Sequence, residues 1–304
     1  MIMPSRTSPH VVVVGYLSID TINMDGRTMT DAPGGAALYA ALGARAAGAS
    51  VSVVACAGED YPARWLSRMT ELGLDVSHIL KVPGPSRRTR LVNMADGGRL
   101  SAHHDDPAWW ERTFALAPST SPHPDADWLV LAPMPAEVAR QIVLSARCPV
   151  IADTSAAYAG KDTGLLMALV SQIACFAPSL EETRLLLPEL DDSMALRRLA
   201  ACGPDVVQKR GADGLAFCAG GHDHVRFVAP AVTRVIDPTG AGDATVGALA
   251  TGLAQGMTLE AAATMAAGIG ARTVGGHGPS ALDFSWQGLD AGPSNFRFSD
   301  CEVS

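Results

Sequence analysis

The residues from Val235 to Thr245 are of the types that phosphoryl transfer to a hydroxyl requires. Positions 240–242 read Gly-Ala-Gly, Asp243 follows directly, and an apolar run without proline comes next. Because that run has the composition of a helix, the glycines are expected at its N-terminal end, where backbone N–H groups lack partners and the helix dipole favours anions. We predict that Asp243 is a general base beside an anion hole formed by Gly240, Ala241 and Gly242.

A second group of candidate residues lies near the N-terminus. Asp20 follows an apolar run, residues 11–14, and Gly34 with Gly35 opens an alanine-rich stretch. A carboxylate accepts hydrogen bonds from two neighbouring hydroxyls, and a glycine pair lets a polar ring approach the backbone. These residues are candidates for binding a hydroxyl-bearing acceptor, although Asp20 taken alone is better explained as a loop residue, since aspartate is common in turns.

The elements that must position these residues alternate between strands and helices. Strands are expected at residues 11–14, 51–55, 128–132, 150–153, 173–176, 206–209 and 215–218. Helices are expected at residues 36–48, 61–72, 137–146, 181–187 and 194–201. This alternation predicts an α/β fold with a doubly wound, mostly parallel central sheet flanked by helices. Ligands bind such sheets beyond the carboxyl ends of the strands, which is where both candidate groups fall.

One insertion, at about residues 86–106, interrupts this alternation. Residues 89–94 and 99–103 flank Ala95-Asp96-Gly97-Gly98, and such turn residues between two short runs predict a β-hairpin. The hairpin carries polar side chains, namely Arg90, Asn93, His103 and His104. We expect a small β lid whose residues contact the acceptor; a plain edge hairpin is the alternative.

Composition narrows the class of protein. The chain has 304 residues and a formal net charge of −8, from 23 basic and 31 acidic residues, with no basic block, which argues against nucleic acid and anionic membranes as partners. No apolar run reaches the roughly 18 residues of a membrane span. Six scattered cysteines favour a reducing compartment, so a cytoplasmic protein is expected. We expect one domain over residues 1–288 and a polar tail over 289–304.

The segment from Val235 to Thr245 closely resembles the C-terminal signature of the PfkB (ribokinase-like) carbohydrate kinase family, usually Asp-Thr-x-Gly-Ala-Gly-Asp-x-Phe. Pro238 and Thr245 depart from that form. The resemblance extends from Val11 to about Leu282. It implies a ribokinase-like fold and an ATP-dependent kinase, EC 2.7.1.-, which phosphorylates a hydroxymethyl group of a small sugar or sugar-like acceptor.

The resemblance also implies roles for the N-terminal residues. Asp20, Gly34 and Gly35 match the family positions that hold the hydroxyls of the acceptor. Tyr39 stands where ribokinase-like members often carry an asparagine that contacts the sugar. A phenol can stack on a ring and donate one hydrogen bond but lacks the paired donor and acceptor of an amide, which weakens the case for ribose itself.

Further positions resemble the nucleotide and metal sites of the family. Glu182 matches the glutamate of an Asn-x-x-Glu motif that organises Mg²⁺, with Ser179 in place of the asparagine; a helix capping box explains the same two residues. Asp237 matches a carboxylate near a monovalent cation, K⁺, in some members. The expected nucleotide contacts are Lys209, Gly211, Gly214, Thr239 and His277.

Alternatives remain for both the nucleotide turn and the function. Residues 206–218 are equally explained by a tight β-hairpin. A nucleoside kinase of the same family, in which Tyr39 stacks on a base, and a non-catalytic binding protein on the same scaffold are rival functions. A dinucleotide oxidoreductase is disfavoured because no Gly-x-Gly-x-x-Gly follows Gly15. The hairpin could also pair across a two-fold axis, so a homodimer is plausible.

Overall fold

The computed structural model describes residues 8–24, 27–93, 99–101, 106–118, 125–230 and 234–283. At its centre lies sheet A, with nine strands in the order β13-β12-β11-β10-β9-β8-β1-β4-β5. Neighbouring strands from β5 to β11 pair in parallel, and β12 and β13 are antiparallel. The strands are β1 (His10–Val14), β4 (Ser50–Ala57), β5 (Leu74–Lys81), β8 (Trp128–Leu131), β9 (Val150–Ala152), β10 (Cys175–Phe176), β11 (Asp205–Lys209), β12 (Leu215–Cys218) and β13 (Arg226–Val228).

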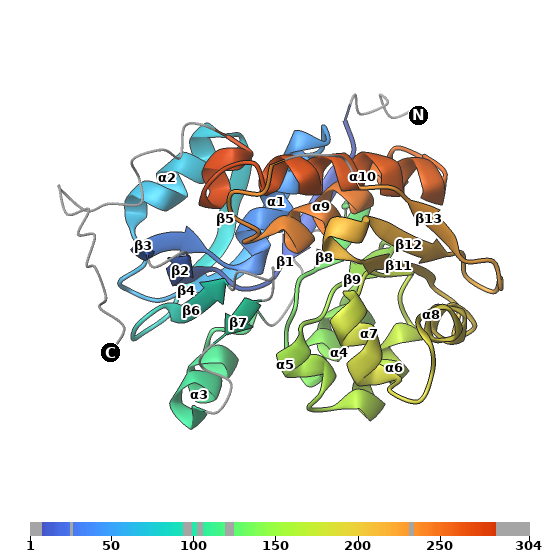
Figure 1. The fold of residues 1–304 in the computed structure, drawn as a ribbon. Helices are drawn as coiled ribbons and strands as arrows, with labels where there is room; N and C mark the ends of the chain where they lie inside the picture. Colours follow the sequence, from blue (N-terminus) through green and yellow to red (C-terminus); the bar gives the residue numbers. More distant parts are fainter. Residues whose placement is uncertain are drawn as a thin grey trace.

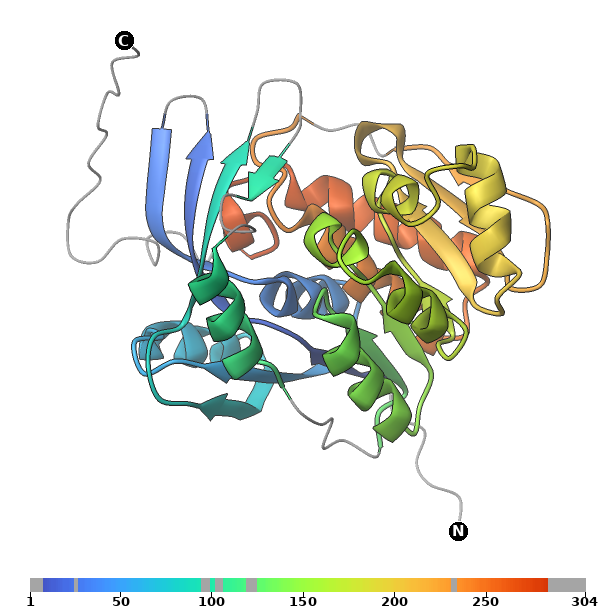
Figure 2. The same ribbon diagram turned by 90° about the horizontal axis from the view of Figure 1, so that it is seen from below.

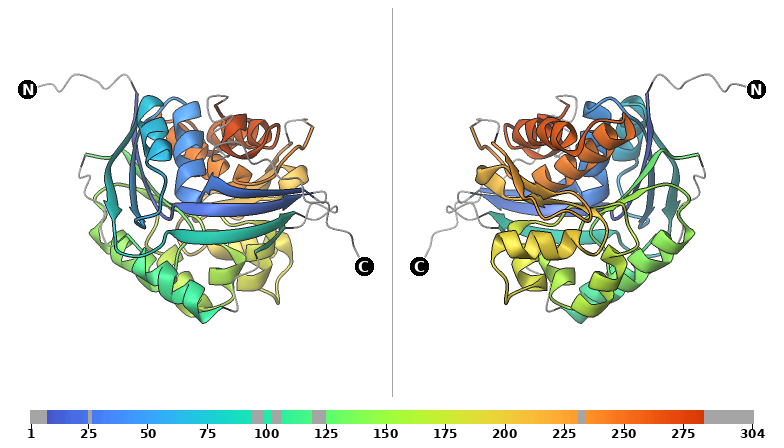
Figure 3. Two further views of the ribbon diagram at one scale, coloured as in Figure 1. Left: turned by 90° about the vertical axis from the view of Figure 1, so that its left-hand side faces the viewer. Right: turned by 90° about the vertical axis from the view of Figure 1, so that its right-hand side faces the viewer.

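Helices cover both faces of sheet A (Figures 1 and 3). One layer contains α1 (Ala36–Ala46), α2 (Ala63–Glu71), α9 (Ala241–Ala254) and α10 (Leu259–Thr273). The other contains α4 (Ala136–Ser145), α5 (Ala156–Ala159), α6 (Thr163–Val170), α7 (Leu180–Leu186) and α8 (Asp192–Ala200). Alternate residues of β1 belong to two separate apolar cores, with Val11 and Val13 in one and Val12 and Val14 in the other. A strand buried on both faces must be apolar throughout, as the sequence of β1 is.

A second sheet, sheet B, stands at one end of sheet A, beside α3 (Pro107–Ala115) (Figure 2). Its order is β3-β2-β6-β7, from β2 (Ser18–Met24), β3 (Arg27–Gly34), β6 (Arg87–Asn93) and β7 (Arg99–Ser101). Strands β6 and β7 pair antiparallel, as predicted for the hairpin. The hairpin also pairs in parallel with β2, which in turn pairs antiparallel with β3. The expected lid hairpin is therefore half of a larger sheet.

Helices α1 and α9 cross closely, and this crossing brings the two groups of candidate residues, one at the start of each helix, near each other. A Cβ atom on Gly43 would lie 2.1 Å from the carbonyl oxygen of Ala244, and one on Gly247 would lie 1.9 Å from that of Ala40. Both positions therefore require glycine, because any side chain would push the helices apart. This crossing fixes the start of α9, with its Gly-Ala-Gly-Asp stretch, relative to α1.

The structure corrects the sequence-based assignment of several elements. Strand β5 and helices α3 and α6 were not predicted, nor was β13. Asp20 lies within β2, not in a loop as residue type alone favoured, because this segment gains its backbone partners from β3 and β6. No described helix is long and apolar enough to cross a membrane. The described cysteines, Cys56, Cys148, Cys175, Cys202 and Cys218, are all free thiols.

Candidate active site

The start of α9 has the backbone geometry of an anion hole. Gly240 caps the helix in the left-handed region, at φ 75° and ψ 0°, and as a glycine it has no side chain to form a capping hydrogen bond. The Ala241 N–H donates to the Pro238 carbonyl in a long bond of 3.3 Å, and within the described chain the N–H groups of Gly240 and Gly242 are left to an external acceptor. Asp243 lies in that first turn and is half-buried. Next to it, the buried hydroxyl of Thr239 has no hydrogen-bond partner among the described residues. An oxyanion would satisfy both the N–H groups and this hydroxyl.

Tyr39 supports this turn from behind. Its side chain is only 2% exposed. A Cβ atom on Gly240 would lie 2.1 Å from Cγ and Cδ1 of the Tyr39 ring, so the ring packs directly on the glycine. The position favours a packing role for Tyr39 beneath the anion hole over the predicted stacking on an acceptor.

Asp237 braces the same turn. The carboxylate is 1% exposed. The backbone N–H of Thr239 donates to its Oδ1 at 2.9 Å, and that of Gly278 donates to its Oδ2 at 3.0 Å. Asp237 thereby joins the approach to α9 to the start of the 3₁₀ turn η2 (Gly278–Ala281). These two bonds explain a buried carboxylate at this position, and the predicted monovalent cation near it stays a prediction.

Lys209 brings a positive charge to the first turn of α9. A Cβ atom on Gly242 would lie 3.6 Å from the Lys209 Nζ. The ammonium donates to both carboxylate oxygens of Asp153 at 2.5 Å, and both side chains are largely buried. Burial lowers the pKa of Lys209, but the charges of Asp153, Glu182 and Asp243 outweigh burial and raise it. Three carboxylates from separate parts of the chain therefore act on an ammonium that lies beside the anion hole.

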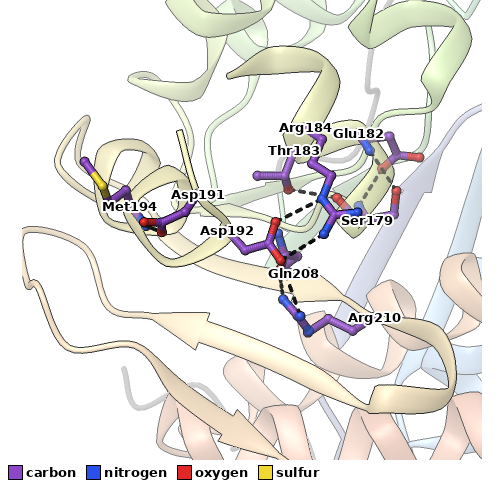
Figure 4. A network of polar contacts seen from close by, with 9 residues as sticks. All are labelled: Ser179, Glu182, Thr183, Arg184, Asp191, Asp192, Met194, Gln208 and Arg210. Atoms are coloured by element: carbon purple, nitrogen blue, oxygen red, sulfur yellow. Dashed lines mark hydrogen bonds and ion pairs between the residues drawn. The ribbon is translucent and has the colours of Figure 1, made fainter. Parts of the chain in front are cut away.

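Glu182 forms the capping box that residue spacing allowed as one explanation (Figure 4). The Ser179 N–H donates to Glu182 Oε2 at 2.6 Å, and the Glu182 N–H donates to Ser179 Oγ at 3.1 Å. Burial raises the pKa of Glu182 to about 7; the Asp153 carboxylate also raises it, and the Lys209 ammonium and the bonds from Ser179 oppose the rise. The cap accounts for Oε2 only, so Oε1 remains for another partner.

The raised pKa of Glu182 predicts a specific pH dependence of stability. Its ordinary value is 4.5, so between pH 4.5 and about 7 the folded protein holds a proton that the unfolded chain releases. The free energy of unfolding should therefore fall as pH rises through this interval, by up to about 1.4 kcal/mol per pH unit for one proton. Urea unfolding of Glu182→Gln should lack this component.

Glu181→Gln is the matched control, because Glu181 is exposed on the same first turn. It should keep the wild-type slope. If Glu182→Gln had the same slope as the wild type, the proton would belong to another group.

Asp20 and Gly34 form the second half of the candidate site. Asp20 is 4% exposed on β2. A Cβ atom on Gly34 would lie 1.9 Å from the Asp20 Oδ2, so the carboxylate rests on the glycine backbone. Gly35 follows at φ 98° and caps α1. Tyr39 comes four residues later, just over one helical turn or roughly 6 Å along α1. The Asp20 group and the anion hole are thus linked through the first turn of α1.

The structure shows fewer contacts to the candidate site for the other predicted residues. Arg90 is exposed on β6, and Asn93 ends this strand; His103 and His104 lie outside the described residues. His277 is exposed and precedes η2. Strands β11 and β12 form the hairpin that was the alternative explanation of this segment, and its turn uses Gly211 at φ 57° and Gly214 at φ 79°. The Lys209 side chain at the end of β11 nonetheless reaches the start of α9.

Sequence reasoning missed two charged residues near the candidate site. Asp153 directly follows the apolar strand β9, and a charge at the carboxyl end of a parallel strand was an available signal. Arg87, at the start of β6, lies between the rings of Tyr16 and Trp109, at 5.1 and 4.5 Å from their centroids. The hairpin pattern gave no sign of this contact between sheet B, α3 and the residue Tyr16 that follows β1.

Comparison with known proteins relates the chain to kinases. A model of the pfkB family carbohydrate kinases matches residues 8–285. A cytidine kinase of Thermococcus kodakarensis is 30% identical over 258 residues, which are 82% of this chain and 90% of that protein.

Solved structures share the fold. A nucleoside kinase of Burkholderia thailandensis, in complex with inosine, superposes with a TM-score of 0.73 at 19% identity, over 91% of this chain and 97% of that one. The aminoimidazole riboside kinase of Salmonella enterica, complexed with aminoimidazole riboside and an ATP analogue, gives a TM-score of 0.66 at 20% identity, over 90% of this chain and 96% of that one.

Proposed function

The chain belongs to the pfkB family of carbohydrate kinases and is an ATP-dependent kinase of a sugar or nucleoside, and on that premise we propose that its acceptor is a nucleoside, phosphorylated on its hydroxymethyl group. The observation that carries the proposed chemistry is the start of α9, where a glycine-capped first turn, Asp243 and the Lys209 ammonium adjoin.

In the proposed mechanism, Asp243 accepts the proton of the acceptor hydroxyl. The N–H groups of Gly240, Ala241 and Gly242 stabilise the negative charge on the transferred phosphoryl group. Thr239 and Lys209 add a hydroxyl and an ammonium to the same region, and both are of the chemical type that binds phosphate oxygens. Such fixed donors need no reorganisation during the reaction, which is why they lower the barrier.

We propose Mg²⁺ as the metal that accompanies ATP. Mg²⁺ needs few protein carboxylates because phosphates and waters complete its shell. Glu182 fits this demand, since its Oε1 is not used by the capping box. Bound there with the nucleotide, the metal would neutralise phosphate charge. A K⁺ near Asp237 is a separate proposal, which replacing K⁺ by tetramethylammonium in the assay tests.

The acceptor would be held from the N-terminal side. Asp20, on the backbone of Gly34, offers carboxylate oxygens to two neighbouring hydroxyls, which a ribose ring supplies. Gly35 packs against the backbone that leads into β2, where a Cβ atom would lie 2.3 Å from the Tyr16 carbonyl oxygen, and so sets the start of α1 close to Asp20. Sheet B would cover the acceptor as a lid over the kinase domain, with Arg90, Asn93 and His103 as its predicted contacts, and exclude water during transfer.

A nucleoside is preferred over a free sugar because the relative at 30% identity is a cytidine kinase. Tyr39 does not decide between the two, since its ring is buried against Gly240 and a nucleoside carries the same ribose ring. A small sugar or polyol is the second candidate, because the family match is to carbohydrate kinases.

An acceptor panel tests the proposal. ADP release from Mg·ATP should depend on added cytidine or another nucleoside and should be much weaker with ribose, fructose or inositol. A 5′-deoxynucleoside lacks the attacking hydroxyl, so it should bind without turnover. Turnover with ribose above that with every nucleoside would establish the second candidate. A homodimer, tested by light scattering, stays a prediction.

A further inference from the structure

Asp153 pairs directly with Lys209 but is not one of the residues proposed to bind the acceptor, the nucleotide or a metal. It follows β9, whose carboxyl end lies beside those of β8 and β10 in sheet A. Its side chain is 3% exposed, and both of its carboxylate oxygens accept hydrogen bonds from the Lys209 Nζ at 2.5 Å. A contact through both carboxylate oxygens holds the ammonium in one position and keeps it protonated.

The other carboxylates near Lys209 hold it less directly. The charges of Glu182 on α7 and Asp243 on α9 both interact favourably with the ammonium. Asp153, by contrast, forms a direct ion pair with Lys209, at 2.5 Å. Glu182 is engaged with the Ser179 N–H, and Asp243 is the candidate base. The position of the ammonium beside Gly242 therefore depends chiefly on Asp153.

A lysine side chain has four rotatable bonds and reaches a buried phosphate site only if something directs it there. Without Asp153, the ammonium would leave its buried position for water, because an unpaired buried charge is costly. With Asp153, it stays within a few ångströms of the first turn of α9, 3.6 Å from where a Gly242 Cβ would lie. The ion pair thus prepares the site before nucleotide binds.

From this geometry we infer that Asp153 is a positioning residue, which holds the Lys209 ammonium at the anion hole so that it contacts the phosphates of ATP. The inference rests on the proposed function for the identity of the ligand. It differs from a purely structural role because Asp153 is expected to affect nucleotide binding and turnover only through Lys209.

A double-mutant cycle tests this dependence. Asp153→Asn should lower kcat/KM for ATP by up to about 10²-fold, as misplacement of a catalytic group does. It should also weaken binding of Mg²⁺ with a non-hydrolysable ATP analogue in calorimetry and leave the affinity for the acceptor without nucleotide unchanged. In a Lys209→Met background, the same substitution should change these quantities by less than about threefold, because the group it positions is gone.

Two further variants keep the test decisive. Asp205→Asn removes a carboxylate at the opposite end of β11 and should match the wild type. If Asp153→Asn does not fold, Asp153→Glu keeps the charge but shifts it by one methylene, and it should lower analogue affinity only when Lys209 is present.

Equal losses from Asp153→Asn with and without Lys209 would overturn the inference and indicate a direct role, such as binding a cation. The proposed function fails separately: if no nucleoside or sugar is phosphorylated by the wild type, the analogue titrations still decide whether Asp153 acts through Lys209.

Discussion

Replacing Asp243 by Asn should lower kcat by about 10²–10⁴, the usual contribution of a general base. The amide keeps the size of the side chain and the first turn of α9 but cannot accept the proton of the hydroxyl. The anion hole is built from backbone N–H groups, so binding of an ATP analogue should be largely kept. Steady-state kinetics with the best nucleoside and calorimetry with the analogue measure the two effects separately.

The matched control for this variant is Glu260→Gln. Glu260 lies in the first turn of α10, as Asp243 does in that of α9, so both substitutions remove a carboxylate from a helix N-terminus. The control should keep kcat, which separates proton transfer from any effect of the helix dipole. A kcat for Asp243→Asn within about threefold of the wild type, well short of the loss expected of a base, would remove Asp243 from the mechanism.

Much of the central fold could be predicted from the sequence because its signals are local. A run such as Val11–Val14, apolar at every position, needs both faces buried and so predicts an inner parallel strand, as β1 is. Glycine and proline residues at the helix ends located the starts of α1 and α9 within a few residues. Strand β10 was predicted over 173–176 but comprises two residues, because only Cys175 and Phe176 meet the ladders of β9 and β11.

Sheet B was only half predicted for a different reason. The segment from Ser18 to Gly34 has mixed polarity, and its strands are defined by pairing with each other and with β6, far along the chain. An Asp-Gly dipeptide at residues 25–26 was a usable hairpin signal that sequence reasoning passed over. Pairing between segments remote in sequence leaves no periodic trace in either one.

The candidate site likewise has one part that could be predicted from the sequence and another that could not. Gly240 and Asp243 could be found because a helix start and its first turn are adjacent in sequence. Contacts across the fold could not: Lys209 and Asp153 are 56 positions apart, and only the order of strands in sheet A brings them together. The capping box of Ser179 and Glu182 was predictable from spacing, but the burial that raises the pKa of Glu182 was not.

Gly240→Ala should be the most damaging small substitution in the anion hole. An alanine there must adopt a positive φ, at a cost of about 1–2 kcal/mol. Its Cβ would also lie 2.1 Å from the Tyr39 ring, which is buried and has little room to move. The start of α9 should therefore shift, and a misplacement of about 1 Å can reduce turnover by about 10²-fold. We expect a loss of that order in kcat and a lower Tm.

Gly256→Ala separates backbone strain from the clash with Tyr39. Gly256 follows the same helix at φ 77°, against 75° for Gly240, and a Cβ added to it meets nothing within 4 Å. This variant should lose stability but keep kcat. Removing the ring instead, in Gly240→Ala/Tyr39→Ala, should recover part of the turnover lost by Gly240→Ala, because the clash is gone and the two substitutions are coupled. If kcat of the double variant were no higher than the product of the two single losses predicts, the ring would not support the anion hole, and Tyr39 would be free for the acceptor contact predicted from sequence.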